Sequence, residues 1–163
     1  MRYPPGNPTL EDTKQCAIQI IAAYEETHHV KVIDIDEVGN SLGCSPALEF
    51  AVGNPTVRKI AAINPLDNLR AQLGREQPEF VWLLEPINNW DNVSLAGKLS
   101  PNQELDVISS GKDGRVPLAA KRRISLGNKG HFSIIPGAGH DDPLGIKVGA
   151  LATNLNRLGF FKP

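Results

Sequence analysis

The sequence has few cysteines for its length. Its 163 residues include two, Cys16 and Cys44. Two thiols cannot form a disulfide framework, and a chain of this length buries a core large enough to fold without one. We therefore expect both thiols to be reduced, which favours a cytoplasmic protein.

The sequence also lacks an excess of charge and any long apolar run. Its 17 basic residues nearly balance 18 acidic ones, giving a formal net charge of -1. Nucleic-acid binding relies on excess positive charge, so we expect no nucleic-acid partner. No apolar stretch approaches the roughly 20 residues of a membrane-spanning helix, and no signal-peptide pattern opens the chain. The partner is unknown from sequence, and a peptide or a protein is the candidate.

The remaining composition is that of an ordinary globular domain, with 40% hydrophobic and 21% charged residues. Residues 1–8 contain three prolines and a glycine and predict an extended arm. The other prolines and glycines are spread out, which indicates many turns and no linker. We therefore expect residues 9–163 to form a single domain.

Helices are expected in several parts of the chain. Thr9 can cap a helix that runs to about residue 27, with Glu11 and Asp12 in the first turn, where the helix dipole favours acids. Ser45-Pro46 is typical of a helix start and predicts a short helix over 46–52. Further helices are expected at 56–63, 66–73 and 143–158.

Strands are expected where β-branched and aromatic residues cluster. The elements do not alternate regularly between strand and helix. This order predicts an α+β fold in which a mixed or antiparallel sheet with short helices lies between an N-terminal and a C-terminal helix. The expected strands are 30–35, 80–84, 105–109, 123–126 and 132–135.

The first candidate site combines a cysteine, a histidine and an acid. Cys44 directly precedes an expected helix start, where backbone N–H groups and the helix dipole favour a thiolate. His131 begins an apolar stretch and could accept the thiol proton, while Asp142 or Asp141 could orient the imidazole ring. These residues predict a small cysteine-dependent hydrolase that needs no cofactor.

Three short segments carry a resemblance to a known family: Cys44-Ser45-Pro46-Ala47-Leu48, Gly130-His131-Phe132 and Asp142-Pro143-Leu144-Gly145. They resemble the papain-like cysteine peptidases that cleave leaders from bacterial secreted peptides. The resemblance implies that Cys44 is the nucleophile, His131 the base and Asp142 the orienting acid.

A second candidate rests on Asp34 and Asp36, which follow an apolar strand and are separated by one residue. This string is similar to the first motif of haloacid-dehalogenase-like phosphatases. The resemblance implies that Asp34 attacks phosphorus, that Asp36 acts as acid and base, and that Mg²⁺ neutralises the phosphate. It also implies supporting roles for later residues: phosphate binding by Ser109 or Ser110, charge neutralisation by Lys121, and metal binding by Asp141 or Asp142.

Two further interpretations stay open. His28 and His29 with His140, Asp141 and Asp142 could bind Zn²⁺ or Mn²⁺, but no ligand spacing defines a site, so the metal is unknown. The chain could instead be a non-enzymatic binding or assembly module, with an exposed apolar or basic patch in place of a pocket. The cysteine hydrolase is the working hypothesis, and the phosphatase and the binding module are its alternatives.

Overall fold

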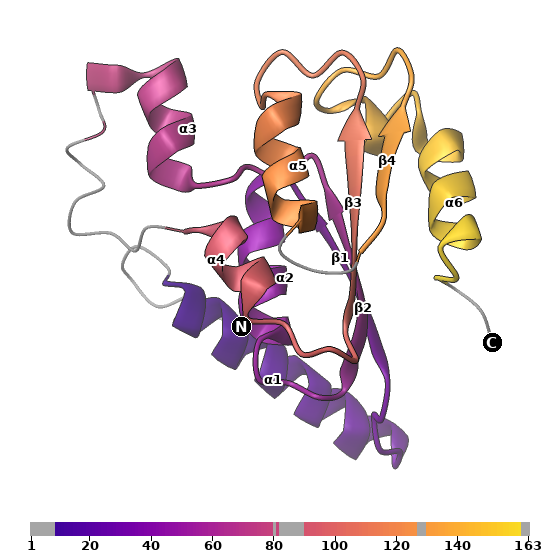
Figure 1. Ribbon diagram of the computed structural model, residues 1–163. Helices are drawn as coiled ribbons and strands as arrows, with labels where there is room; N and C mark the ends of the chain where they lie inside the picture. The colour runs from indigo at the N-terminus through magenta and orange to yellow at the C-terminus, as the bar shows by residue number, and fades with distance from the viewer. Residues whose placement is uncertain (1–8, 80, 82–89, 127–129, 161–163) are drawn as a thin grey trace.

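The computed structural model describes residues 9–79, 81, 90–126 and 130–160, and it has an α/β architecture (Figure 1). A four-stranded sheet has the order β1-β2-β3-β4, and each neighbouring pair is parallel. The expectation of a mixed or antiparallel sheet is therefore wrong, because each strand returns through a helical crossover. The strands are β1 (Ile35–Asn40), β2 (Val57–Ile63), β3 (Glu104–Ser110) and β4 (Phe132–Ile135).

Helices cover both faces of this sheet (Figure 1). One face packs through Leu48, Leu95 and Ile124, which belong to α2 (Cys44–Ala51), α4 (Asn92–Gly97) and α5 (Leu118–Leu126). On the other face, Leu151 and Leu155 of α6 (Val148–Arg157) pack on the sheet. Further helical segments are α1 (Leu10–His28), α3 (Leu69–Glu76) and the short turns η1 (Ser41–Gly43) and η3 (Asp142–Leu144).

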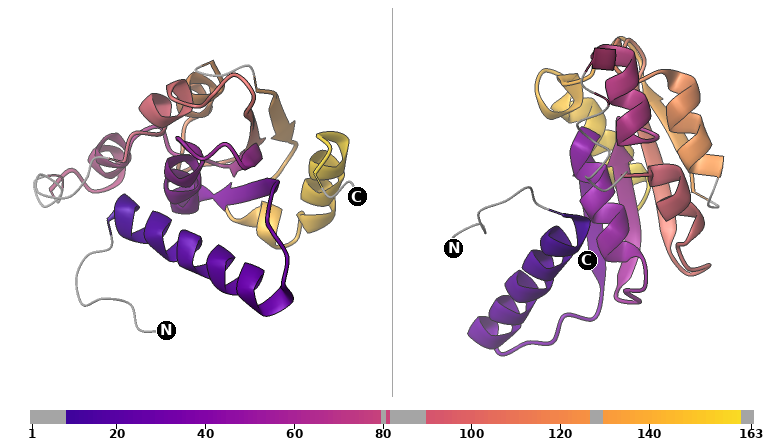
Figure 2. Two further views of the ribbon diagram at one scale, coloured as in Figure 1. Left: turned by 90° about the horizontal axis from the view of Figure 1, so that it is seen from below. Right: turned by 90° about the vertical axis from the view of Figure 1, so that its left-hand side faces the viewer.

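Helix α1 lies beside α2, at the β1 edge of the sheet (Figure 2). A capping box starts it: the Asp12 N–H donates to the Thr9 hydroxyl at 3.1 Å, and the Thr9 N–H donates to the Asp12 carboxylate at 2.9 Å. None of its residues, all of which the structure describes, is fully buried. Within the described part of the chain, no helix is both long and apolar enough to cross a membrane.

Strand β2 shows why one sequence-based expectation is wrong. Residues 56–63 were expected to be helical, yet 57–63 form a strand whose last four residues are buried. Ile60 and Ala62 pack on the α2 face, while Ala61 and Ile63 pack on the α6 face. A parallel strand buried on both faces loses the alternating pattern that identifies a strand in sequence.

Other expected elements are confirmed or displaced. Helix α1 and strands β3 and β4 lie where they were expected, and α2 begins two residues earlier than predicted. The strand expected at 30–35 begins only at Ile35, and residues 123–126 belong to helix α5. The strand expected at 80–84 falls, apart from Val81, outside the described residues. The last helix, α6, begins at Val148, beyond the expected start at 143.

Candidate active site

A sharp turn joins β1 to α2 and carries Ser41 at its tip. Ser41 has a left-handed backbone with φ of 53°, which is uncommon for a residue with a side chain. The turn is close: a Cβ added at Gly39 would lie 2.7 Å from the Cys44 Cα and 2.8 Å from the Gly43 carbonyl oxygen. The sequence Gly39-Asn40-Ser41-Leu42-Gly43 thus has the Gly-x-Ser-x-Gly form of a nucleophile elbow, in which a strained turn presents a serine hydroxyl.

Ser41 is hydrogen-bonded to a histidine that an acid holds in place. The His140 Nε2 lies 2.8 Å from the Ser41 Oγ, and the His140 Nδ1 lies 2.8 Å from the Asp113 Oδ2. Ser41 follows β1, Asp113 follows β3 and His140 follows β4. The carboxyl ends of parallel strands lie at one edge of the sheet, which is why residues far apart in sequence meet here.

The Asp113 carboxylate is almost fully buried and strongly bonded. The Arg115 and Val116 N–H groups donate to its Oδ1 at 2.8 and 3.0 Å. The Lys121 ammonium lies 2.5 Å from its Oδ2, the oxygen that also faces His140. Burial acts to raise the pKa of Asp113, but the hydrogen bonds from Lys121, Val116, His140 and Arg115 outweigh it and lower the pKa. Asp113 is therefore an anion that can orient and stabilise the imidazole ring.

Lys121 is itself buried, with 0% of its side chain exposed. Burial lowers the pKa of Lys121, and the contact with Asp113 opposes that change. The ammonium also donates to the Asn64 Oδ1 at 3.1 Å and to the Ser109 hydroxyl at 3.3 Å. A buried ammonium is tolerated when such partners satisfy it.

Asn64 is hydrogen-bonded to two of the segments that follow the strands at this site. Its backbone is left-handed, with φ of 47°, and directly follows β2. Its side-chain amide donates to the Ser110 hydroxyl at 2.8 Å and to the His140 carbonyl at 2.6 Å. Its Oδ1 accepts the Ser110 N–H at 2.7 Å. This fully buried amide fixes the loop that carries His140 against the ends of β2 and β3.

This arrangement has the parts of a serine-type nucleophilic site. His140 can accept the Ser41 proton when the hydroxyl attacks, and Asp113 can stabilise the imidazolium that results. The Leu42 N–H, next after the nucleophile at the start of the η1–α2 helical segment, is the backbone donor that such elbows direct at a developing oxyanion.

The structure places Cys44 in the apolar core, with 0% exposure. Its thiol donates to the Ile63 carbonyl oxygen at 3.5 Å, and burial raises the pKa of the thiol far above its ordinary value. A buried neutral thiol is a poor nucleophile. The helical segment already begins at Ser41, so Cys44 lies one turn further along and faces inward.

The other sequence-predicted residues have separate partners. The His131 Nδ1 lies 3.0 Å from Asp106 and 3.2 Å from Glu104. Asp142 accepts the Gly139 N–H at 2.7 Å, and exposed Asp141 lies 3.7 Å from Arg115. The contacts of the described residues therefore do not bring Cys44, His131 and either aspartate together.

The residues of the phosphatase hypothesis also lie apart from one another. Asp34 precedes β1 and forms an exposed ion pair of 3.4 Å with Arg58. Ser109 and Lys121 are buried around Asp113 at the other end of the sheet. Phosphoryl transfer by Asp34 therefore finds no support in this geometry.

Sequence reasoning missed Ser41 and Asp113 and considered His140 only as a metal ligand. The signal for Ser41 was present, because glycines flank it two residues away on either side. None of the sequence-predicted sites includes residues 39–43, so the elbow pattern was overlooked.

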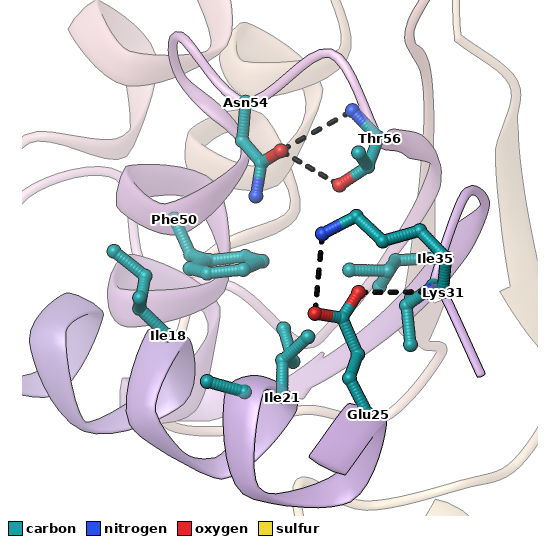
Figure 3. A pocket seen from close by; sticks show the side chains of 10 residues that line it. Ile18, Ile21, Glu25, Lys31, Ile35, Phe50, Asn54 and Thr56 are labelled. Carbon is teal, nitrogen blue, oxygen red and sulfur yellow. Dashed lines mark hydrogen bonds and ion pairs between the residues drawn. The ribbon is translucent and has the colours of Figure 1, made fainter. Parts of the chain in front are cut away.

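A separate hollow of about 250 Å³ lies between α1, α2 and the start of β1 (Figure 3). Ile18, Ile21 and Phe50 line it, and an ion pair of 3.2 Å between Glu25 and Lys31 closes one side. It lies near the N-terminal end of β1, whereas Ser41 follows the C-terminal end. The described residues that line it include no serine, cysteine or histidine, so we do not assign the chemistry to this hollow.

Comparison with known proteins gives matches by structure alone. No family model matches the sequence. No curated protein matches it either. A hydrolase from Pseudomonas aeruginosa has 15% identity and a TM-score of 0.68, with 97% of this chain and 75% of that one covered. A lipase-esterase related protein from Clostridium acetobutylicum has 15% identity and a TM-score of 0.68, with coverage of 96% and 79%.

A third match is a serine-to-alanine mutant of the meta-cleavage product hydrolase from Pseudomonas fluorescens. Its identity is 15% and its TM-score is 0.67, with 96% of this chain and 75% of that one covered. These neighbours are α/β-hydrolase-fold proteins. The resemblances to papain-like peptidases and to haloacid-dehalogenase-like phosphatases are therefore wrong. The chain has the fold of the α/β hydrolases.

Proposed function

We propose that this chain is a serine hydrolase that cleaves carboxylic esters or related acyl compounds. Ser41 is the nucleophile, His140 the general base and then the general acid, and Asp113 the orienting acid. The observation that carries the proposal is the continuous hydrogen-bonded path from the Ser41 Oγ through the His140 ring to the Asp113 carboxylate, with both contacts at 2.8 Å. The α/β-hydrolase fold of the solved neighbours supports the same class of chemistry.

The reaction takes two steps. Ser41 attacks the acyl carbon as its proton passes to the His140 Nε2, and the Leu42 N–H donates to the oxyanion. His140 then protonates the leaving alcohol, which departs and leaves an acyl-serine. In the second step His140 removes a proton from water as the water oxygen attacks the acyl carbon. The bond between that carbon and the Ser41 Oγ then breaks, His140 returns the proton to the Oγ, and the carboxylic acid leaves.

Hydrolysis of p-nitrophenyl acetate tests this function. We expect Ser41→Ala and His140→Ala each to lower kcat/KM by roughly 10³-fold or more, because the residues of such a triad act as a unit. Ser100→Ala, at an exposed serine, is the matched control and should leave the rate unchanged. EDTA should also have no effect, in contrast to the Mg²⁺-dependent alternative. Equal rates for Ser41→Ala and the wild type would contradict the proposal.

A further inference from the structure

Three polar residues gather at the end of the sheet opposite Ser41. Glu104 and Asp106 project from the same face of β3, because side chains two apart in a strand share a face. His131 directly precedes β4, which runs parallel to β3 (Figure 1). Gly130 lies so close to β3 that an added Cβ would fall 1.3 Å from the Leu105 carbonyl oxygen. This contact fixes the backbone that carries His131 against β3.

The three ligand atoms are already spaced as a small metal ion requires. The His131 Nδ1 lies 3.0 Å from the Asp106 Oδ1 and 3.2 Å from the Glu104 Oε1. Each of the three residues offers one ligand atom that lies within 4.8 Å of those of the other two. Tetrahedral zinc, with bonds of about 2.0 to 2.2 Å to nitrogen and oxygen, keeps its ligands roughly 3.4 Å apart. An ion could therefore enter with only small shifts of the side chains.

Two carboxylate oxygens face a single nitrogen atom, the His131 Nδ1. The Lys59 ammonium donates to the Leu158 carbonyl oxygen and forms an ion pair of 3.8 Å with the other oxygen of Glu104. Among the described residues, no lysine or arginine forms an ion pair with Asp106.

Asp106 is the buried carboxylate of this cluster, and one of its two oxygens has no partner in the described part of the chain. Its side chain is 0% exposed, and its Oδ2 has no hydrogen-bond partner among the described residues. Its Oδ1 accepts the His131 N–H at 3.2 Å. A buried carboxylate is costly unless a cation or enough donors compensate its charge.

We propose that Glu104, Asp106 and His131 bind Zn²⁺. The ligands are the His131 Nδ1 and one oxygen of each carboxylate, and water completes the coordination because the His131 side chain is 66% exposed. The ion joins β3 to the segment that enters β4, and it lies at the end of the sheet away from the Ser41 elbow. Its effect is therefore on stability and not on acyl transfer.

Zinc binding to the whole chain tests the site after treatment with a chelator. Titration calorimetry with ZnCl₂ should show one ion bound per chain, and zinc should raise the melting temperature. His131→Ala and Glu104→Gln should each weaken binding by about tenfold or more and remove the rise. His28→Ala, at an exposed histidine of α1, is the matched control and should bind like the wild type.

The proposal is overturned if the wild type binds no zinc at a zinc concentration of about 100 µM. Structural zinc sites bind the ion far more tightly than this concentration requires. It is also overturned if His131→Ala binds as tightly as the wild type. Should His131→Ala fail to fold, Asp106→Asn and Glu104→Gln, which keep the side-chain shapes, decide the question. Ser41→Ala should retain full zinc binding, so failure of the hydrolase proposal and failure of the zinc proposal are distinguishable.

Discussion

Lys121 is the residue whose placement adds most to the chemistry of the site. Its ammonium lies 2.5 Å from the Asp113 Oδ2, the oxygen that His140 also contacts at 2.8 Å. The hydrogen bond from Lys121 lowers the pKa of Asp113 and so favours the ionised form of the orienting acid, which burial alone would disfavour. Lys121 therefore acts as a positioning residue, because it holds the charged carboxylate that orients His140.

Replacing Lys121 with methionine should lower both stability and activity. The variant leaves the Asp113 carboxylate buried without its cation, and removing one partner of a buried ion pair costs about 3 to 5 kcal/mol. Urea unfolding should show this loss, and kcat/KM for p-nitrophenyl acetate should fall because the acid that orients His140 is no longer held in place. Lys112→Met, at an exposed lysine next to Asp113 in sequence, is the control. Equal stability and equal rates for Lys121→Met and the wild type would contradict this role.

Single residues also show what sequence could predict of the site. The Gly-x-Ser-x-Gly pattern over residues 39–43 marks Ser41, so the nucleophile could have been identified from sequence. Asp113 and His140 are 27 residues apart, and their contact depends on the order of the strands in the sheet. This contact could not have been predicted from sequence. Cys44 was interpreted as a reactive thiol because sequence does not show that its side chain points into the core.

At the scale of elements, the turn between β1 and α2 decides whether the nucleophile can be presented. Gly39 has no room for a side chain, because the start of α2 lies against it. Gly43, four residues on, has nothing within 4 Å of the position that a Cβ would take. These two glycines form a matched pair for mutation.

Gly39→Ala should destabilise the protein and reduce hydrolysis, whereas Gly43→Ala should do neither. The added methyl group at position 39 must push α2 away from β1, and such overpacking costs about 1 to 3 kcal/mol. Urea unfolding and the p-nitrophenyl acetate assay measure the two effects. If Gly39→Ala matched Gly43→Ala in both assays, the close packing of this turn would be refuted.

The elements differ in how far the sequence determines them. Helix α1 has a complete capping box at Thr9 and Asp12, and its prediction is confirmed. Strand β2 and helix α5 were assigned the wrong type, because burial on both faces of a central strand and the contacts of a crossover helix override local pattern. Parallel pairing depends on those crossovers, so the sheet topology was wrong as well.

For the molecule as a whole, Glu37 should make stability depend on pH. Burial raises the pKa of Glu37 to about 8, from an ordinary value of 4.5, and its Oε2 has no hydrogen-bond partner among the described residues. Between these values the folded chain retains a proton that the unfolded chain releases. The free energy of unfolding should therefore fall as pH rises through this window and level off above it.

Glu37→Gln should remove most of this dependence, because glutamine does not ionise. Urea unfolding at pH 5 and pH 8 measures the change in the free energy of unfolding between these two pH values. The wild type should lose more stability from pH 5 to pH 8 than Glu37→Gln does. Glu26→Gln, at an exposed glutamate of α1, should behave like the wild type. Equal losses for Glu37→Gln and the wild type would show that the carboxyl group of Glu37 is solvated.

The most direct test of the central claim is covalent labelling by a fluorophosphonate, whose phosphorus an activated serine attacks with loss of fluoride. Mass spectrometry of the whole chain and of its peptides should show one adduct, on Ser41, that is absent from Ser41→Ala and forms far more slowly in His140→Ala. No adduct on the wild type, or an adduct that persists in Ser41→Ala, would contradict the assignment of Ser41, His140 and Asp113 as the catalytic residues.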